Sequence, residues 1–243
     1  MAEDEIRKHT KAAISAATGK QHGWKHKLHE ILLEVMIIIF AVSVSIWLHN
    51  WSDGLKEKKE AKEFLQGLKL DLEVDTFNLV NSKSFYQQEL DGINYFLAVA
   101  AGQPLSNDSL AKYNFVFSAS TNLEANTSRY TGFKGSAKFE IIENKDLLGE
   151  IIDLHEVVFS HIQVLDNVFN NYNATKTEPY VFAHVQLDNN FNIRNAEEVV
   201  RSSQMKLQML LLKSLISNSI IPYHQKAIGK CKEVMKGIDD ELD

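Results

Sequence analysis

The sequence predicts an all-α protein, with one N-terminal transmembrane helix followed by an extracytoplasmic helical bundle of long helices. Three observations support this fold class. Residues 31–51 form one apolar stretch, apolar residues recur at helical spacing through most of the remaining chain, and helix-breaking residues are scarce. The 243 residues contain 3 Pro and 11 Gly, so few positions interrupt a helix.

The apolar stretch reads ILLEVMIIIFAVSVSIWLHNW over residues 31–51. As a helix it would be about 31 Å long, which matches the hydrocarbon thickness of a bilayer. Trp24 precedes it, and Trp47 and Trp51 lie at its far end, where amphipathic rings prefer the headgroup layer. We therefore predict a transmembrane helix that these three tryptophans anchor at the interfaces.

One face of this helix combines an acid with small residues. Glu34, Ala41 and Ser45 lie at helical spacing, and Ala41 and Ser45 form a small-xxx-small pair that allows close helix packing in lipid. Glu34 has two interpretations. Either it reaches the nearer headgroup region or is protonated, or it faces a helix assembly and serves as a functional group inside the membrane.

The predicted helix divides the chain into a cytoplasmic head (1–30), the transmembrane helix (31–51) and a periplasmic helical domain (52–243). The flanks of the helix hold four Lys before it and five after it within 20 residues, so the positive-inside rule does not decide the orientation. Acidic residues accompany the cations of the second flank. We expect the N-terminus in the cytoplasm and the tail outside it.

Composition and motifs argue against several classes of function. The net charge is −6, and residues 52–243 hold 20 Lys and Arg against 27 Asp and Glu, whereas nucleic-acid binding needs a basic surface. Cys231 is the only cysteine, so it has no partner for an intrachain disulfide; a buried thiol and an intermolecular disulfide are its two interpretations. No phosphate-binding loop, HExxH or GxSxG motif occurs. We expect no enzyme activity, no cofactor and no metal.

The tail carries three helical patterns. Positions 65, 72, 79, 86, 93 and 100 are apolar and form one stripe, although its companion positions include Asp75, Ser82 and Glu89. From 139 to 172 apolar residues occupy almost every face, as in a buried helix. The last helix, from 196, has a heptad seam through Leu207, Leu210, His224, Ile228 and Cys231, and Pro222 interrupts it. That seam fits either an intramolecular bundle or self-association.

The region between the last two patterns is the least helical. Tyr180-Val181-Phe182 and Phe191-Asn192-Ile193 have strand-like composition, with turn residues at 188–190 between them. A small β-hairpin near 180–193 is therefore an expectation of the sequence.

Two blocks of residues resemble a known family. The helix that opens with Glu34 and closes on Asn50-Trp51-Ser52-Asp53, together with the block from Tyr130 through Lys134-Gly135-Ser136 to Leu147, is similar to an uncharacterised family of single-pass membrane proteins from Bacteroidetes. The resemblance spans about residues 30–155. It implies a bacterial inner-membrane location and no established activity. In such bacteria Asp108-Ser109-Leu110 also resembles the O-glycosylation signal of exported proteins, which favours an exported tail.

These observations lead to two hypotheses. In the first, the protein is a bitopic inner-membrane protein whose helical domain is an interaction, scaffold or sensor-like module. Its partners would be the lipid bilayer, further copies of itself as a homo-oligomer, and other membrane or periplasmic proteins, but not nucleic acid. In the second, several copies surround an ion or proton path that uses Glu34 inside the membrane.

Overall fold

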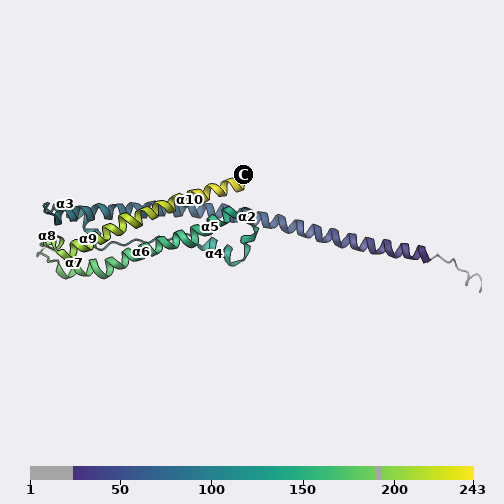
Figure 1. The fold of residues 1–243 in the computed structure, drawn as a ribbon, viewed down its shortest axis with the longest axis horizontal. Coiled ribbons are helices and arrows are strands. Elements are labelled where there is room, and N and C mark those ends of the chain that lie inside the picture. The colour runs from purple at the N-terminus through teal and green to yellow at the C-terminus, as the bar shows by residue number, and fades with distance from the viewer. Residues whose placement is uncertain (1–23, 190–192) are drawn as a thin grey trace, which may run out of the picture. The chain divides into compact units, whose positions relative to one another are not determined.

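The computed structural model describes residues 24–189 and 193–243 of the chain, and it confirms the predicted all-α class (Figure 1). Over these residues no β-strand occurs. The chain divides into two compact units, the first ending at Glu57 and the second running from Lys58 to Asp243. Helix α2 (Trp24–Ala100) contributes residues to both units.

The described part of the first unit is the beginning of α2. From Ile31 to Trp51 its large apolar side chains are between 45 and 70 % exposed, except Val44, which is partly buried. Among the described residues, α2 is the one helix whose length and composition suffice to cross a membrane. The prediction of a membrane-crossing helix therefore agrees with the structure in length and apolar character.

The second unit consists of three long helical stretches with short helices packed around them (Figure 1). The first stretch is α2 from Lys58 onward. The second comprises α5 (Lys145–Ile152), the π-helix η3 (Asp153–Phe159), α6 (Ser160–Tyr172), the π-helix η4 (Asn173–Thr177) and α7 (Glu178–His184). The third comprises α9 (Ser203–Leu215), the π-helix η5 (Ile216–Ile220) and α10 (Ile221–Leu242). The short elements are α3 (Asn107–Tyr113), the 3₁₀-helix η1 (Asn114–Phe117), α4 (Ser128–Gly135), the 3₁₀-helix η2 (Lys138–Ile141) and α8 (Ala196–Arg201).

Side-chain contacts fix the directions of the three stretches. Lys58 pairs with Glu143 at 3.1 Å, just before the second stretch, and Tyr86 meets Asp166 further along, so α2 and the second stretch run in the same direction. Lys69 pairs with Asp239 at 2.6 Å, and Lys83 contacts Gln225. The third stretch therefore runs antiparallel to α2.

The core lies along the predicted apolar stripe of α2. Every stripe residue is buried in the second unit, which confirms the seven-residue pattern: Leu65, Leu72, Leu79, Tyr86, Ile93 and Ala100. Two apolar clusters result. One surrounds Leu72 and Leu79, and the other surrounds Ile93 and Phe96 near the far end of the bundle.

The predicted seam of the last helix is only half right. Its second half is buried inside the bundle, including His224, Ile228 and Cys231, as the intramolecular interpretation requires. Its first half is exposed at Leu207 and Leu210, because the core there uses Met205, Met209 and Leu212 instead. The π-helix η5 lies between the two halves, and its extra residue per turn shifts the buried face. Pro222 follows directly, in the first turn of α10.

The predicted hairpin is largely wrong. Tyr180-Val181-Phe182 belongs to α7, which continues directly from η4 and has Pro179 in its first turn. What remains is a single antiparallel bridge between Leu187 and Ile193, with the Arg194 amide donating to the Gln186 carbonyl at 2.8 Å. Phe191 and Asn192 lie outside the described residues.

Helix ends follow the expected local chemistry. Gly102 has a φ of 118° just after α2, a backbone conformation that favours glycine. The Ser106 hydroxyl accepts from the Ser109 amide at the start of α3, and the Asn144 side chain accepts from the Leu147 amide at the start of α5.

Candidate functional site

Three polar residues occupy the inner face of α2. Asp75, Ser82 and Glu89 follow one another at intervals of seven, in step with the apolar stripe, so the helix turns all three toward the bundle interior. Asp75 and Glu89 have no exposed surface, and Ser82 retains 8 %. Burial of a charged carboxylate destabilises the fold unless the group is paired or protonated. The neighbours of each buried acid therefore determine its protonation state.

The central group of polar side chains joins three helices and a loop. Tyr86 Oη donates to Asp166 Oδ1 at 2.6 Å, and the Leu123 amide donates to Asp166 Oδ2 at 2.8 Å. His224 Nε2 lies 4.0 Å from Asp166 Oδ1, while its Nδ1 lies 3.0 Å from the Ile220 carbonyl oxygen. The arrangement fastens the loop before α4 to α2, α6 and α10.

Burial shifts the protonation of this group. It raises the pKa of Asp166, against the opposing effect of the Tyr86 and Leu123 hydrogen bonds, and it lowers the pKa of His224. His224 is therefore neutral at neutral pH, with Nδ1–H donated to Ile220. Asp166, Tyr86 and His224 are closed to solvent, so no substrate can reach them.

Glu89 is a buried acid without a hydrogen-bond partner in the described part of the chain. Neither of its carboxylate oxygens has a hydrogen bond to any residue that the structure describes. Burial alone raises the pKa of Glu89 to about 8, so the side chain is a neutral acid at pH 7.

Two further polar contacts hold the loop 118–127 and α4 against the bundle. The Asn126 amide and side-chain Nδ2 each donate to Asp75 Oδ1 at 2.9 Å. Tyr130 stacks on His155 of η3 at 4.2 Å between ring centroids and donates to Glu156 at 2.8 Å. These side chains position secondary structure and do not line an accessible site.

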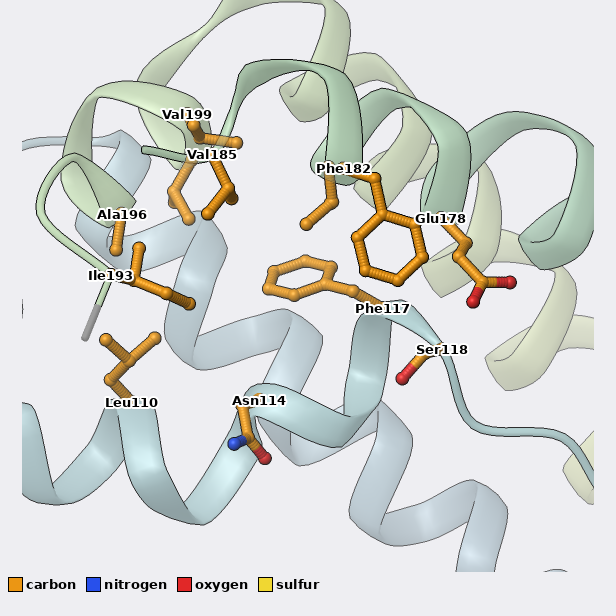
Figure 2. A pocket seen from close by; sticks show the side chains of 12 residues that line it. Leu110, Asn114, Phe117, Ser118, Glu178, Phe182, Val185, Ile193, Ala196 and Val199 are labelled. Atoms are coloured by element: carbon orange, nitrogen blue, oxygen red, sulfur yellow. The ribbon is translucent and has the colours of Figure 1, made fainter. Parts of the chain in front are cut away.

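An accessible concave site with mainly apolar walls lies at the end of the bundle remote from Lys58. A cavity of about 160 Å³ opens between α3 and η1, α7, and α8 (Figure 2). Its walls are mainly apolar, and its polar lining residues are Asn114, Ser118 and Glu178. Figure 2 shows Glu178 beside the ring of Phe182, whereas Leu110, Ile193 and Ala196 lie toward the opposite side.

The membrane-segment residues that the sequence singled out lie on the first unit. Glu34, Ala41 and Ser45 are exposed, and Ser45 Oγ donates to the Ala41 carbonyl at 2.8 Å, which satisfies its hydroxyl within the helix. Trp47 and Trp51 are exposed and stack with ring centroids 6.3 Å apart. Trp24 is the first residue of α2, and its side chain lies outside what the structure describes.

The histidines and the cysteine of the helical domain pack against neighbouring helices or aromatic rings. His155 is buried with Nδ1 at 3.0 Å from the Ile151 carbonyl, and His161 stacks on Tyr223. Cys231 is buried as a free thiol. Burial raises its pKa to about 12, so the thiolate does not form at neutral pH.

Comparisons with protein-family models, curated proteins and solved structures find no match to this chain. The class of protein is therefore defined by the fold alone. The chain is a helical domain whose helix α2 is long and, in its first part, apolar enough to cross a membrane.

Sequence reasoning missed the buried acids and the cavity. The seven-residue spacing of Asp75, Ser82 and Glu89 was the available signal for burial, since it coincides with the apolar stripe. Asp166 had no such signal, because its donors come from Tyr86 and from the backbone of Leu123, both distant in sequence. The cavity is built from short segments whose packing the periodicity of one helix does not define.

Proposed function

We propose that the protein is a single-pass membrane protein whose helical domain acts by binding other molecules, as an interaction, scaffold or sensor-like module. The observation that carries this proposal is the uncovered apolar surface from Ile31 to Trp51. Water-soluble monomers rarely expose contiguous apolar patches beyond a few hundred Å². Lipid is the environment in which such a surface is stable.

The distribution of polar groups favours binding over catalysis. Among the described residues, the most deeply buried acids and histidines are closed to solvent inside the bundle, namely Asp75, Glu89, Asp166 and His224. Catalytic groups must reach the reacting atoms within hydrogen-bond distance. The domain also presents apolar surface to its surroundings, in the end cavity and in rows of exposed side chains.

One such row supports self-association. Leu70, Val74 and Phe77 lie at i, i+4 and i+7 on α2, and all are more than half exposed. This spacing places them on one helix face, as in a helix-to-helix contact. We therefore propose a homo-oligomer that uses this row, with Ala41 and Ser45 as the close-packing positions in the membrane.

The proposed location is the bacterial inner membrane, with the N-terminus in the cytoplasm and the helical domain in the periplasm. The resemblance to the Bacteroidetes family supports the inner-membrane location. The resemblance of Asp108-Ser109-Leu110 to the O-glycosylation signal of exported proteins supports a periplasmic helical domain. Alkaline phosphatase fused after Asp243 should be active in cells, because that enzyme folds only outside the cytoplasm. An inactive phosphatase fusion, with a fluorescent GFP fusion at the same point, would reverse the orientation.

The oligomer is tested by measuring the mass of the full chain in lipid nanodiscs. The wild-type chain should be a dimer or larger, and a variant with Leu70→Ser, Val74→Ser and Phe77→Ser should shift toward monomer with unchanged helix content. Val164→Ser with Val168→Ser, two exposed valines on α6, is the matched control and should keep the wild-type mass. A monomeric wild-type chain would overturn self-association.

Glu34 supports a second candidate, an oligomeric ion or proton path. Its carboxyl group has no hydrogen bond or ion pair with any described residue, and a carboxyl in the membrane requires a proton or a partner. Proteoliposomes with the wild-type chain should then take up protons, and Glu34→Gln should abolish uptake. Glu57→Gln, outside the apolar stretch, should not. Equal flux in wild-type and Glu34→Gln liposomes would rule this candidate out.

A further inference from the structure

The end cavity combines an apolar interior with a single acidic group. Its walls come from Leu110 of α3, Phe117 of η1, Val181 and Phe182 of α7, and the apolar residues at 193–200. Four separate elements therefore converge on one space. Cavities of this kind, with apolar walls and few polar groups, are the usual form of small-molecule sites.

The volume limits the size of the apolar part of a ligand. An internal cavity of about 150 Å³ lined by aliphatic and aromatic residues is known to accommodate benzene. The cavity here measures about 160 Å³. The volume therefore matches one six-membered ring or a branched alkyl group of similar size.

The negative charge of Glu178 favours a ligand with a positively charged group. Glu178 is half-buried in the lining, and no ion pair joins it to a described residue. Figure 2 shows the Glu178 side chain next to the ring of Phe182, which lies between Glu178 and the ring of Phe117. Aromatic faces attract cations, and a carboxylate in the same lining adds a charge-assisted hydrogen bond.

The exposure of Phe182 points to an occupant. Its side chain is 71 % exposed, the largest value among the exposed large apolar residues described. A ring that lines a cavity and still faces water gains stability when an apolar group covers it.

We propose that this cavity binds a small organic ammonium compound, with its apolar body of about one ring against Phe117 and Phe182 and its ammonium group at Glu178. This inference rests on the proposed function, since it names the ligand class of the binding domain. Asn114 and Ser118 supply further hydrogen-bond acceptors in the same lining.

The test uses 2-phenylethylamine as the probe, with the full chain in lipid nanodiscs and calorimetry corrected for partitioning into empty nanodiscs. The wild-type chain should bind it saturably, and it should bind 3-phenylpropanoate, of similar size and opposite charge, at least tenfold more weakly. Glu178→Gln should weaken binding of the amine by about fivefold, the effect expected of a partly exposed charge pair. Glu198→Gln, an exposed acid on the adjacent α8, is the matched control and should bind like wild type.

A second variant tests the location independently of charge. Ala196→Leu places three more carbon atoms in the cavity wall and should reduce amine binding at least tenfold, with the unfolding midpoint reported alongside. Absence of saturable binding by the wild-type chain, or equal amine affinity in Glu178→Gln, would overturn the proposal. If the amine fails to bind while the chain still assembles in nanodiscs, the ligand class is wrong and the interaction module stands.

Discussion

Glu89 illustrates how a single buried residue links stability to pH. Its pKa rises from 4.5 to about 8 in the folded protein because burial disfavours the charged form. Between these two pH values the folded chain keeps a proton that the unfolded chain releases. Its contribution to stability is therefore fully present below pH 4.5 and is lost as pH rises to about 8, by at most about 5 kcal/mol.

Glu89→Gln should remove this dependence, since the amide keeps the shape of the neutral acid and carries no charge. We expect the variant to match wild type near pH 4.5 and to exceed it by about 2–5 kcal/mol at pH 8. Urea unfolding of both chains in detergent between pH 4.5 and 8 measures the difference. Asp75 and Asp166, whose pKa values burial also raises, contribute to both chains and cancel.

Glu73→Gln is the control for this experiment, because Glu73 lies on the same helix and is exposed. Its stability should follow the wild-type pH profile. Parallel profiles for wild type and Glu89→Gln would contradict the assignment of the pH effect to Glu89.

The sequence predicts whether a residue is buried where the periodicity of a single helix determines the face on which that residue lies. The stripe from Leu65 to Ala100 was predictable because a seven-residue interval fixes a helix face. The same interval places Glu89 on that face, but a charged residue type does not by itself predict burial. The pairing of Asp166 with Tyr86 depends on how helices align in space, which no local pattern contains.

At the scale of elements, the π-helix η5 determines the register of the third stretch. It separates a first half whose buried residues include Met209 and Leu212 from a second half built on His224 and Ile228. A π-turn holds one residue more than an α-turn, so the seam read at a constant interval changes face at this point. This is why Leu207 and Leu210, predicted in the seam, are exposed.

Deletion of Asn218 should convert η5 toward α-helix and rotate one half of the stretch by about 100° relative to the other. Both apolar clusters receive residues from this stretch, so the two halves can no longer bury their apolar faces together. We expect a loss of several kcal/mol in unfolding free energy, measured by urea unfolding.

Asn218→Ala is the matched control, because it keeps the residue count and removes only an exposed side chain that contacts Ser214 at 3.2 Å. It should change stability by less than about 1 kcal/mol. A deletion variant as stable as this control would mean that η5 does not set the register.

For the whole molecule, the decisive property is the uncovered apolar segment. Lys at both Ile38 and Phe40 should prevent stable insertion, since each charge near the middle of a membrane helix costs about 2.5–3.5 kcal/mol on insertion scales. The variant should leave the carbonate-resistant membrane fraction. Leu70→Lys with Val74→Lys, equally exposed but in the helical domain, should remain in it. A membrane-retained Ile38→Lys, Phe40→Lys chain would contradict the transmembrane assignment.

The fold class and the apolar segment were predictable because they depend on composition and periodicity along one stretch of chain. The cavity was not, because Phe117, Phe182 and Ala196 belong to elements separated by loops of irregular sequence. The hairpin prediction failed at α7 for a related reason. The strand preference of Tyr180 and Val181 was outweighed by the helix that continues into them from η4.

The seclusion of Cys231 has a practical consequence. Its sulfur is sealed in the bundle as the neutral thiol, so maleimide reagents and mild oxidants meet an inert native background. A cysteine introduced at any exposed position is then the sole reactive handle, and spin labels or fluorophores can be attached one at a time without first replacing the natural residue.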